Sequence, residues 1–522
     1  MKKVLKIVLG TLCLILAGIG IYAFFQFRDR HPNYQVDLRL ATGPGPLEAG
    51  FAKVDITPDY FETWEDVNGN AKYDPDNGDR YIDKNGNGKF DAIWLAGFHN
   101  ARPAQGAHDQ LWARAMVLRS GDITLALCVI DMIGFGNDEV IATRKMISAA
   151  LPDIDYVIVA STHVHSSPDV MGIWGPSEYV SGINKTYVTQ VQTGIKDAVV
   201  QAYEAKKKAR VKFAVDPDKL KNLVGDTRKP LVADAGLKLM QVIDAETSQT
   251  LGTLMNWGNH PETYWSKNLQ LSSDFADPWR NYVEQGIKVS DSLVTPGIGG
   301  VAIFLNGAIG GLMTTHPDMS ITDPYTGKAY AKPSPEKIQA QGKALAKITL
   351  ETLSDTGLPL HTSLDMGMRA KSIQLSMDNR LFHLAAFLGI FDRGFVGWKK
   401  IRSEVSAWYL GPATFVHVPG ELYPEILHGG IESPDGGDFQ LSPVEVPSIG
   451  SQIPGQFAFF SGMSNDMIGY IIPKSEWDVE PPFTFGNNKR PYGEINSLGP
   501  ETGPTIHRDV LGVLKELPQR AQ

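Results

Sequence analysis

DYVIVASTHVHSS (155–167) is a strongly apolar strand that runs directly into two histidines and several hydroxyl side chains. A comparable strand, TLALCVIDM (124–132), precedes it. Between them, Asn137-Asp138-Glu139 begins a predicted helix over 137–150, and Pro152 marks its end. Alternation of strand, helix and strand predicts a parallel or mixed sheet with helices packed on it.

The same alternation continues along the rest of the chain. Further strands are predicted at 249–257, 301–307 and 413–420, and further helices over about 186–208 and after Ser334-Pro335. No low-complexity linker interrupts the sequence after residue 47. We therefore predict an α/β protein of layered mixed β-sheets flanked by helices, with one large catalytic domain over 47–522 and an N-terminal transmembrane helix.

The first thirty residues have the composition of a membrane anchor or a signal segment. Ile7–Phe25 is uncharged, and lysines precede it while Arg28 and Arg30 follow it. Nineteen residues in a helix nearly span a bilayer core of about 30 Å, and no small-residue cleavage site is evident. The sequence favours an uncleaved anchor over 1–30, a stalk over 31–46, and a membrane-anchored body that is extracytoplasmic, in the periplasm or at the cell surface.

The overall charge excludes one class of partner. The chain carries a net charge of −9 although its first thirty residues are basic, so the remaining body is strongly acidic. An acidic body repels phosphate backbones, and no nucleic-acid partner is expected.

Four apolar stretches end in polar residues that suit a metal ion. They are STHVHSS (161–167), NWGNHPET (256–263), HVPGE (417–421) and SNDMIGY (464–470). Burying imidazole or carboxylate without a partner is costly, and open α/β sheets bind ligands at strand ends. The pattern predicts one site built from distant segments, and zinc is the metal that histidine and glutamate fit best.

Individual positions in these stretches have different expected roles. His163 and His165 would face one pocket if the chain is extended there, so one can bind the metal while the other moves a proton or binds substrate. His260 and Glu421 follow or adjoin Gly and Pro residues that fix the backbone, and both are predicted ligands. Arg228, in a loop-like TRKP segment, could bind an anionic or carbonyl oxygen of the substrate.

Residues 66–91 form an insertion with two copies of one calcium-loop-like pattern. Oxygen-bearing side chains occupy positions 1, 3, 5 and 9 of each copy, as in the first part of an EF-hand loop, but position 12 would be Asn77 or Trp94 rather than glutamate. The alternative is a solvated acidic hairpin with Asn-Gly turns. We predict structural Ca²⁺ binding by Asp66, Asn68, Asn70, Asp74, Asp83, Asn85, Asn87 and Asp91.

Over nearly the whole of 47–516 the chain resembles the neutral/alkaline non-lysosomal ceramidases. The ordered motifs that carry the resemblance are AGFAKVDITP, STHVHSSPD, NHPET, VPGE, SNDMIGYIIP and NSLGPETGP. The resemblance implies hydrolysis of the amide of ceramide with one zinc ion. It places the zinc ligands on His163, His260, Glu421 and Tyr470, and it places His165 and Arg228 in the active site.

Two positions depart from that family. Met313 stands where the family has a nucleophilic serine, and Gly311 stands where it has an aspartate, although Thr314 and Thr315 are near. We therefore expect a zinc-dependent hydrolase acting on ceramide or another N-acyl lipid, with metal-bound water replacing the serine. The alternative is a catalytically silent, ceramidase-like protein that binds a lipid or a glycan.

Overall fold

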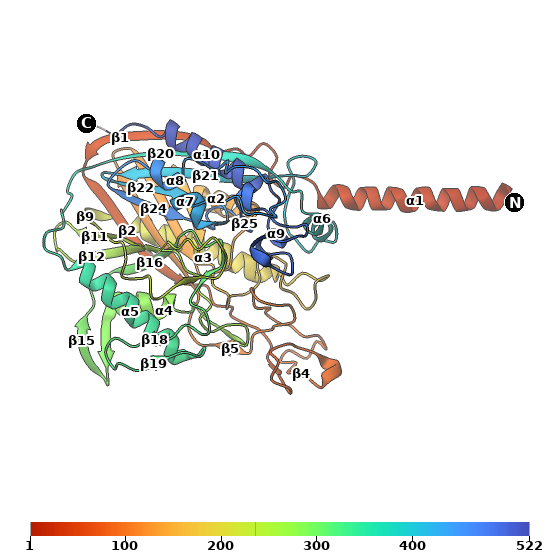
Figure 1. The fold of residues 1–522 in the computed structure, drawn as a ribbon, viewed down its shortest axis with the longest axis horizontal. Coiled ribbons are helices and arrows are strands. Elements are labelled where there is room, and N and C mark those ends of the chain that lie inside the picture. The colour runs from red at the N-terminus through yellow and green to blue at the C-terminus, as the bar shows by residue number, and fades with distance from the viewer. Residues whose placement is uncertain (1, 235, 521–522) are drawn as a thin grey trace.

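The computed structural model describes residues 2–234 and 236–520. Its centre is a pair of β-sheets packed face to face, with helices on both outer sides and one long helix projecting from the body (Figure 1). The architecture confirms the predicted α/β class with layered mixed sheets and one large domain.

The larger sheet has eight strands in the order β16-β12-β11-β9-β2-β6-β7-β8. Two of its pairs, β12 with β16 and β7 with β8, are parallel, and the others are antiparallel. The strands are β2 (Leu47–Asp55), β6 (Trp112–Ser120), β7 (Ile123–Ile130), β8 (Tyr156–Ser161), β9 (Lys207–Asp216), β11 (Leu237–Asp244), β12 (Thr250–Trp257) and β16 (Val301–Asn306).

The smaller sheet has five strands in the order β1-β20-β21-β22-β24, which are β1 (Asp37–Gly45), β20 (Leu364–Ser376), β21 (Lys400–Leu410), β22 (Ala413–His417) and β24 (Phe457–Ser461). One buried cluster contains Leu127 and Ile158 from the large sheet together with Trp408 and Phe459 from the small one. The two sheets therefore bury their facing sides against each other, which accounts for the all-apolar β7 and β8.

Helices cover the outer faces. α2 (Asn137–Ala150) and α3 (Lys185–Glu204) close one apolar cluster on the large sheet, and α4 (Ala276–Gln285) and α5 (Pro335–Leu353) close another. α10 (Thr502–Glu516) lies on the small sheet (Figure 1). α5 begins as predicted, because the Ser334 side chain accepts a hydrogen bond from the backbone of Lys337 and Pro335 takes the first turn.

Two predicted boundaries were wrong. The helix over 186–208 ends at Glu204, and residues 207–208 already belong to β9. The predicted stalk over 31–46 is not a free connection either, because residues 37–45 form β1 and pair in antiparallel fashion with β20. The segment pairs because Leu38 and Leu40 pack against the core between the sheets, an alternation that the Pro and Gly content of the stretch hid.

At the N-terminus, α1 (Lys2–Gln26) has no buried residue and projects from the body (Figure 1). Among the described residues it is the one helix long and apolar enough to cross a membrane. Length and composition alone also fit a signal sequence, as the sequence analysis allowed.

Candidate metal centre and pocket

Three imidazoles and one carboxylate converge at the ends of strands that are far apart in sequence. His163 follows β8, His260 follows β12, and Glu421 begins the short strand β23 (Glu421–Leu422). The ring centres of His163 and His260 are 5.0 Å apart, and His165 lies 5.1 Å and 5.5 Å from them. One ligand atom from each of the three imidazoles lies within 4.8 Å of the others.

Glu421 lies between two of these rings. Its Oε2 is 3.1 Å from Nε2 of His260, and its Oε1 is 3.6 Å from Nε2 of His163. The δ nitrogens of both rings face away, since Nδ1 of His163 lies 2.6 Å from the carbonyl oxygen of Ile133 and Nδ1 of His260 lies 2.7 Å from that of Met313. A δ proton donated to a carbonyl leaves each ε nitrogen as a free lone pair, which is the arrangement of histidines that bind metals.

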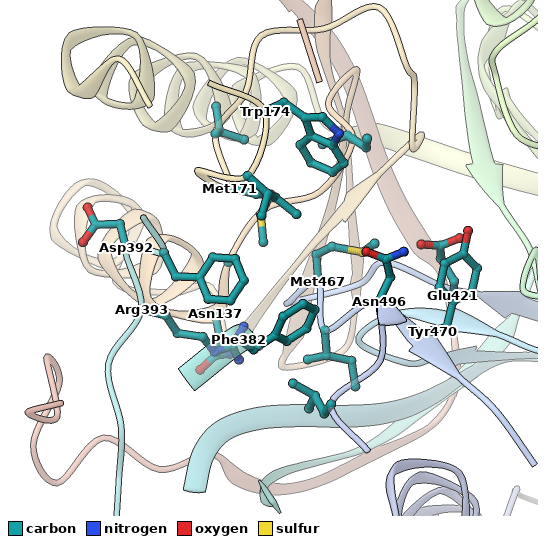
Figure 2. Close-up of a pocket in the computed structure, with 18 of the residues that line it drawn as sticks. Asn137, Met171, Trp174, Phe382, Asp392, Arg393, Glu421, Met467, Tyr470 and Asn496 are labelled. Atoms are coloured by element: carbon teal, nitrogen blue, oxygen red, sulfur yellow. The ribbon is translucent and has the colours of Figure 1, made fainter. Parts of the chain in front are cut away.

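The fourth predicted ligand, Tyr470, is adjacent to Glu421. It starts β25 (Tyr470–Ile471), which runs parallel to β23 with Tyr470 directly opposite Glu421. Figure 2 shows the two side chains beside each other at one end of the pocket. Burial, with Glu421 nearby, raises the pKa of the Tyr470 phenol well above its ordinary value.

His165 has a different environment from the other two histidines. Its Nδ1 lies 3.0 Å from Oε2 of Glu262, an ion-pair distance at an angle unsuited to a hydrogen bond, so both ring nitrogens are buried without a hydrogen-bond partner. Gly97 packs directly on the ring, because a Cβ built there would lie 2.7 Å from His165 Cγ. The ring is held in place by packing, while its nitrogens are left available.

The electrostatics favour a neutral His163 beside ionised carboxylates. Burial lowers the pKa of His163 to about 3. Burial opposes a charge on His260 as well, but the neighbouring Glu421 and Glu262 raise the pKa of His260 overall. Burial alone would raise the pKa of Glu421 and of Glu262, but neighbouring histidines reverse the effect. The pKa of Glu421 is lowered overall, and the pKa of Glu262 is lowered to about 2. A neutral His163, an ionised Glu421 and unpartnered nitrogens on His165 together fit a divalent cation better than they fit a packed core.

The cluster borders an apolar pocket, and His163, His165 and Glu421 line one end of it. Figure 2 shows Met171 and Trp174 along one side, Phe382 opposite them, and Asp392 at the end away from Glu421. The side chains of Met467 and Ile468 also line the cavity. A long apolar cavity that ends in a few polar groups suits an amphiphilic ligand.

Arg228 lies elsewhere. Its guanidinium pairs with the buried carboxylates of Glu425 and Glu476, and it stacks on the ring of Tyr423 at 4.0 Å. It is not among the described residues that line the pocket. Its predicted role in orienting the substrate remains a prediction.

The structure shows where Met313 and the two neighbouring threonines lie. The side chain of Met313 is fully buried in an apolar cluster, and only its carbonyl reaches the site, through His260. The Thr315 hydroxyl donates to the carbonyl of Leu223 and accepts from Asn259. Thr314 is buried with its hydroxyl unpartnered.

The 66–91 insertion folds as two similar loops joined by the short strands β3 (Trp64–Glu65) and β4 (Arg80–Tyr81). In each loop the first aspartate, Asp66 or Asp83, accepts hydrogen bonds from three following backbone N–H groups. Asn68 and Asn70 accept from the backbone two residues ahead of each, as do Asn85 and Asn87. Both copies therefore share one backbone arrangement.

Sequence reasoning missed a buried carboxylate beside each loop. Asp79 accepts from the backbone N–H of Val67 and Asp74, at positions 2 and 9 of the first loop. Glu62 accepts from the corresponding positions of the second loop, Lys84 and Asp91. Glu62 and Asp79 lie outside the repeated pattern, one before it and one between its copies, so spacing alone could not reveal them.

Sequence reasoning also missed Glu262 and the apolar lining of the pocket. Glu262 was visible in the NHPET segment, two residues after a predicted ligand. Met171, Trp174 and Phe382 gave no such signal, because they come from loops and a short helix without a polar pattern.

The fold and the site together define a class, an α/β protein with a candidate metal centre at the strand ends of its sheets. No model of a known protein family matches the chain, and no curated protein matches it by sequence. Solved structures do match in fold. A neutral ceramidase from Pseudomonas aeruginosa superposes with a TM-score of 0.61 at 14% identity, covering 91% of this chain and 76% of that one. A structure described as ceramidase complexed with C2 gives the same TM-score and identity, covering 91% and 77%. This chain thus has a ceramidase-like fold, as its motifs led us to expect.

Proposed function

We propose that this protein is a zinc-dependent hydrolase that cleaves the amide of ceramide or of another N-acyl lipid. The observation that carries the proposal is the convergence of His163, His260 and Glu421 beside an apolar pocket in a ceramidase-like fold. The apolar pocket suits a lipid substrate, and the cluster of metal-binding side chains suits hydrolysis.

Within this proposal His163, His260, Glu421 and Tyr470 hold the zinc ion. When bound, zinc would polarise a carbonyl oxygen and lower the pKa of water to near 7, which would supply the nucleophile that Met313 cannot. Packing against Gly97 holds the His165 ring beside Glu262, so that a ring nitrogen can accept a proton and return it to the leaving amine. The apolar side chains of Met171, Trp174 and Phe382 accommodate the acyl chain and exclude water.

The length and apolar composition of the N-terminal helix support a location at a membrane. We infer that α1 anchors the chain and that the body is extracytoplasmic, because three lysines precede the apolar stretch and positive charge favours the cytoplasmic side.

The test combines metal content with turnover. Mass spectrometry of the purified full chain should find one zinc ion at the site in the wild type and in His361→Ala, a matched control at a histidine remote from the cluster, and none there in His260→Ala. Zinc-loaded wild type should hydrolyse members of a panel of N-acyl lipids that includes ceramide. Full zinc retention by His260→Ala would overturn the proposed ligand set.

A second experiment distinguishes two roles for His165, because its position also suits a metal ligand. If His165 moves a proton, His165→Ala keeps its zinc and loses about 10²–10⁴-fold in kcat. If it is a ligand, His165→Ala loses the zinc as well.

The second candidate is a silent protein that binds a lipid or a glycan at the same site. It is favoured by the burial of Met313 at the nucleophile position and by the ion pairing of Arg228 away from the pocket. Zinc-loaded protein that binds N-acyl lipids and turns over no amide or ester of the panel would identify it.

A further inference from the structure

The short helix α6 (Arg380–Phe387) and the hairpin after it expose large apolar side chains to solvent. Leu381, Leu384 and Leu388 are 60%, 49% and 42% exposed, and their spacing places them on one side of the helix. Trp398, near the hairpin tip, is 84% exposed. We call these four side chains the α6 face.

Helix α6 lies at the base of α1 (Figure 1). Tyr22 of α1 packs edge-on against Phe387 at 5.5 Å, and Phe27 packs against Phe395 at 5.0 Å. A shallow cavity at this junction is lined by Phe27, Leu384 and Trp398 among others. α6 and the end of α1 therefore form one continuous apolar surface.

The junction is fixed, because charged residues directly after α1 pair with the body. Asp29 accepts from Arg402 at 2.6 Å, and Arg30 pairs with Asp392. A bilayer crossed by α1 would thus meet the body at a defined level. Tyr22 lies four residues before the end of α1, about 6 Å along the helix axis and inside the uncharged stretch. Since Phe387 contacts Tyr22, α6 lies at the depth that interfacial helices occupy, about 5–10 Å.

The charges around the α6 face suit lipid headgroups. Arg380 and Lys400 are exposed beside it, and Lys399 adjoins Trp398. Of the acids near it, Asp29 and Asp392 are each paired with an arginine, and Asp378, before the N-cap of α6, is exposed. Tryptophan next to lysine is typical of side chains that lie between hydrocarbon and phosphate groups.

The other side of α6 faces the metal centre's pocket. Phe382 lines that pocket and packs against Phe391 at 5.0 Å, and Asp392 lies at the pocket end away from Glu421 (Figure 2). One short helix therefore separates the pocket from the surface beside α1.

We propose that the α6 face is a second membrane-contact element, whose partner is the surface of the bilayer that α1 crosses. It seats the body on the membrane with the outer end of the pocket at the lipid interface. The substrate route rests on the proposed function: an N-acyl lipid passes from the leaflet along Phe382 toward Glu421 without crossing bulk water.

Docking is tested by probe depth, independently of catalysis. The full chain with Cys13→Ser is reconstituted, one copy per nanodisc, in phosphatidylcholine and phosphatidylglycerol, and an environment-sensitive fluorophore is attached at Leu384→Cys. The matched control is Glu246→Cys, in the exposed turn at the end of β12 away from the site. The probe at 384 should be blue-shifted and quenched by lipids with a nitroxide on the upper acyl chain, and the control should be quenched only by aqueous iodide.

Equal quenching of both probes by iodide would overturn the proposal. So would a blue shift at 384 that appears only when a nanodisc holds two copies, because the α6 face would then bind a second copy of the chain.

The substrate route has its own measurement. Leu384→Glu with Leu388→Glu should lower turnover of a long-chain N-acyl lipid in the bilayer about tenfold or more, because each buried leucine is worth at least one factor of ten. Turnover of a soluble short-chain amide should stay within about twofold, as should both activities of the control Leu293→Glu, an exposed leucine on β15 (Ser292–Pro296). Equal loss on both substrates would refute the route. Absence of all turnover in the wild type would refute the proposed function and leave the depth measurement valid.

Discussion

His163 occupies a left-handed backbone conformation, with φ of +65°, which is uncommon for a residue with a side chain. We expected His163 and His165 to face one pocket because residues two apart in an extended chain point to the same side. The two rings do lie close together, but the chain is not extended at His163, so the reason for the prediction was wrong. The chain turns after Ser161, and the turn is held by the N–H groups of Thr162 and His163, which donate to the carbonyls of Ile130 and Met132. Backbone strain of this kind is concentrated at functional sites.

Asp109 provides a test of buried charge away from the proposed ligands. Its carboxylate accepts from Ser272 Oγ at 2.5 Å and from the backbone of Ser273 at 2.6 Å. Burial, with Asp277 nearby, raises the pKa of Asp109 from 3.8 to about 7. The folded state therefore binds the proton more tightly than the unfolded state does, so this group's contribution to stability is full below pH 4 and is lost as the pH rises to 7.

We expect Asp109→Asn to abolish the loss of stability that Asp109 causes as the pH rises. Asparagine can accept from Ser273 and donate to Ser272, so the variant should gain stability relative to wild type between pH 5 and pH 8, by at most about 4 kcal/mol. The measurement is Tm against pH, with the exposed Asp122→Asn as control. Parallel curves for wild type and Asp109→Asn would contradict the assignment.

At the scale of elements, the two loops of 66–91 make a prediction about calcium. Their shared backbone arrangement and the buried carboxylates Glu62 and Asp79 support the sequence hypothesis of Ca²⁺ binding at both. Saturating Ca²⁺ should raise Tm, since about 2.7 kcal/mol is expected at a hundredfold excess over Kd. Asp66→Ala and Asp83→Ala should each remove one site by calorimetric titration.

Asp76→Ala is the matched control, because Asp76 is an exposed acid in the same insertion that lies outside both loop patterns. A titration in which Asp66→Ala binds as much Ca²⁺ as Asp76→Ala would leave an acidic hairpin as the better description.

Elements also show what the sequence could predict. The strands 156–161 and 250–257 and the helix 137–150 were foreseeable because their apolar runs and caps are local signals. The convergence of His163, His260 and Glu421 was foreseeable from polar residues at strand ends. β1 was missed because pairing with β20, more than three hundred residues away, overrides its weak local preference. Glu62, Glu262 and the lining of the pocket depend on tertiary contacts that no local pattern encodes.

At the scale of the whole molecule, one buried ion pair joins the two sheets. Arg144 on α2 donates to both oxygens of Glu404 on β21, at 2.8 Å each, and the hydroxyl of Tyr156 on β8 donates to the same carboxylate. Asn465, in the segment that leads to Tyr470, donates to it as well. The cluster therefore ties the large sheet, the small sheet and the metal-site segment together.

We expect Glu404→Gln to destabilise the whole body, because removing one partner of a buried pair leaves Arg144 charged and uncompensated, at a cost of about 3–5 kcal/mol. Asp37→Asn is the matched control. Its carboxylate also pairs with an arginine between strands, Arg369 at 2.5 Å, but Asp37 is 61% exposed and the loss should be about 0–1 kcal/mol. Chemical denaturation of the detergent-solubilised chain gives both values. If the loss is confined to zinc affinity while the denaturation midpoint is unchanged, the cluster supports only the metal site and the sheets are held together by their apolar core alone.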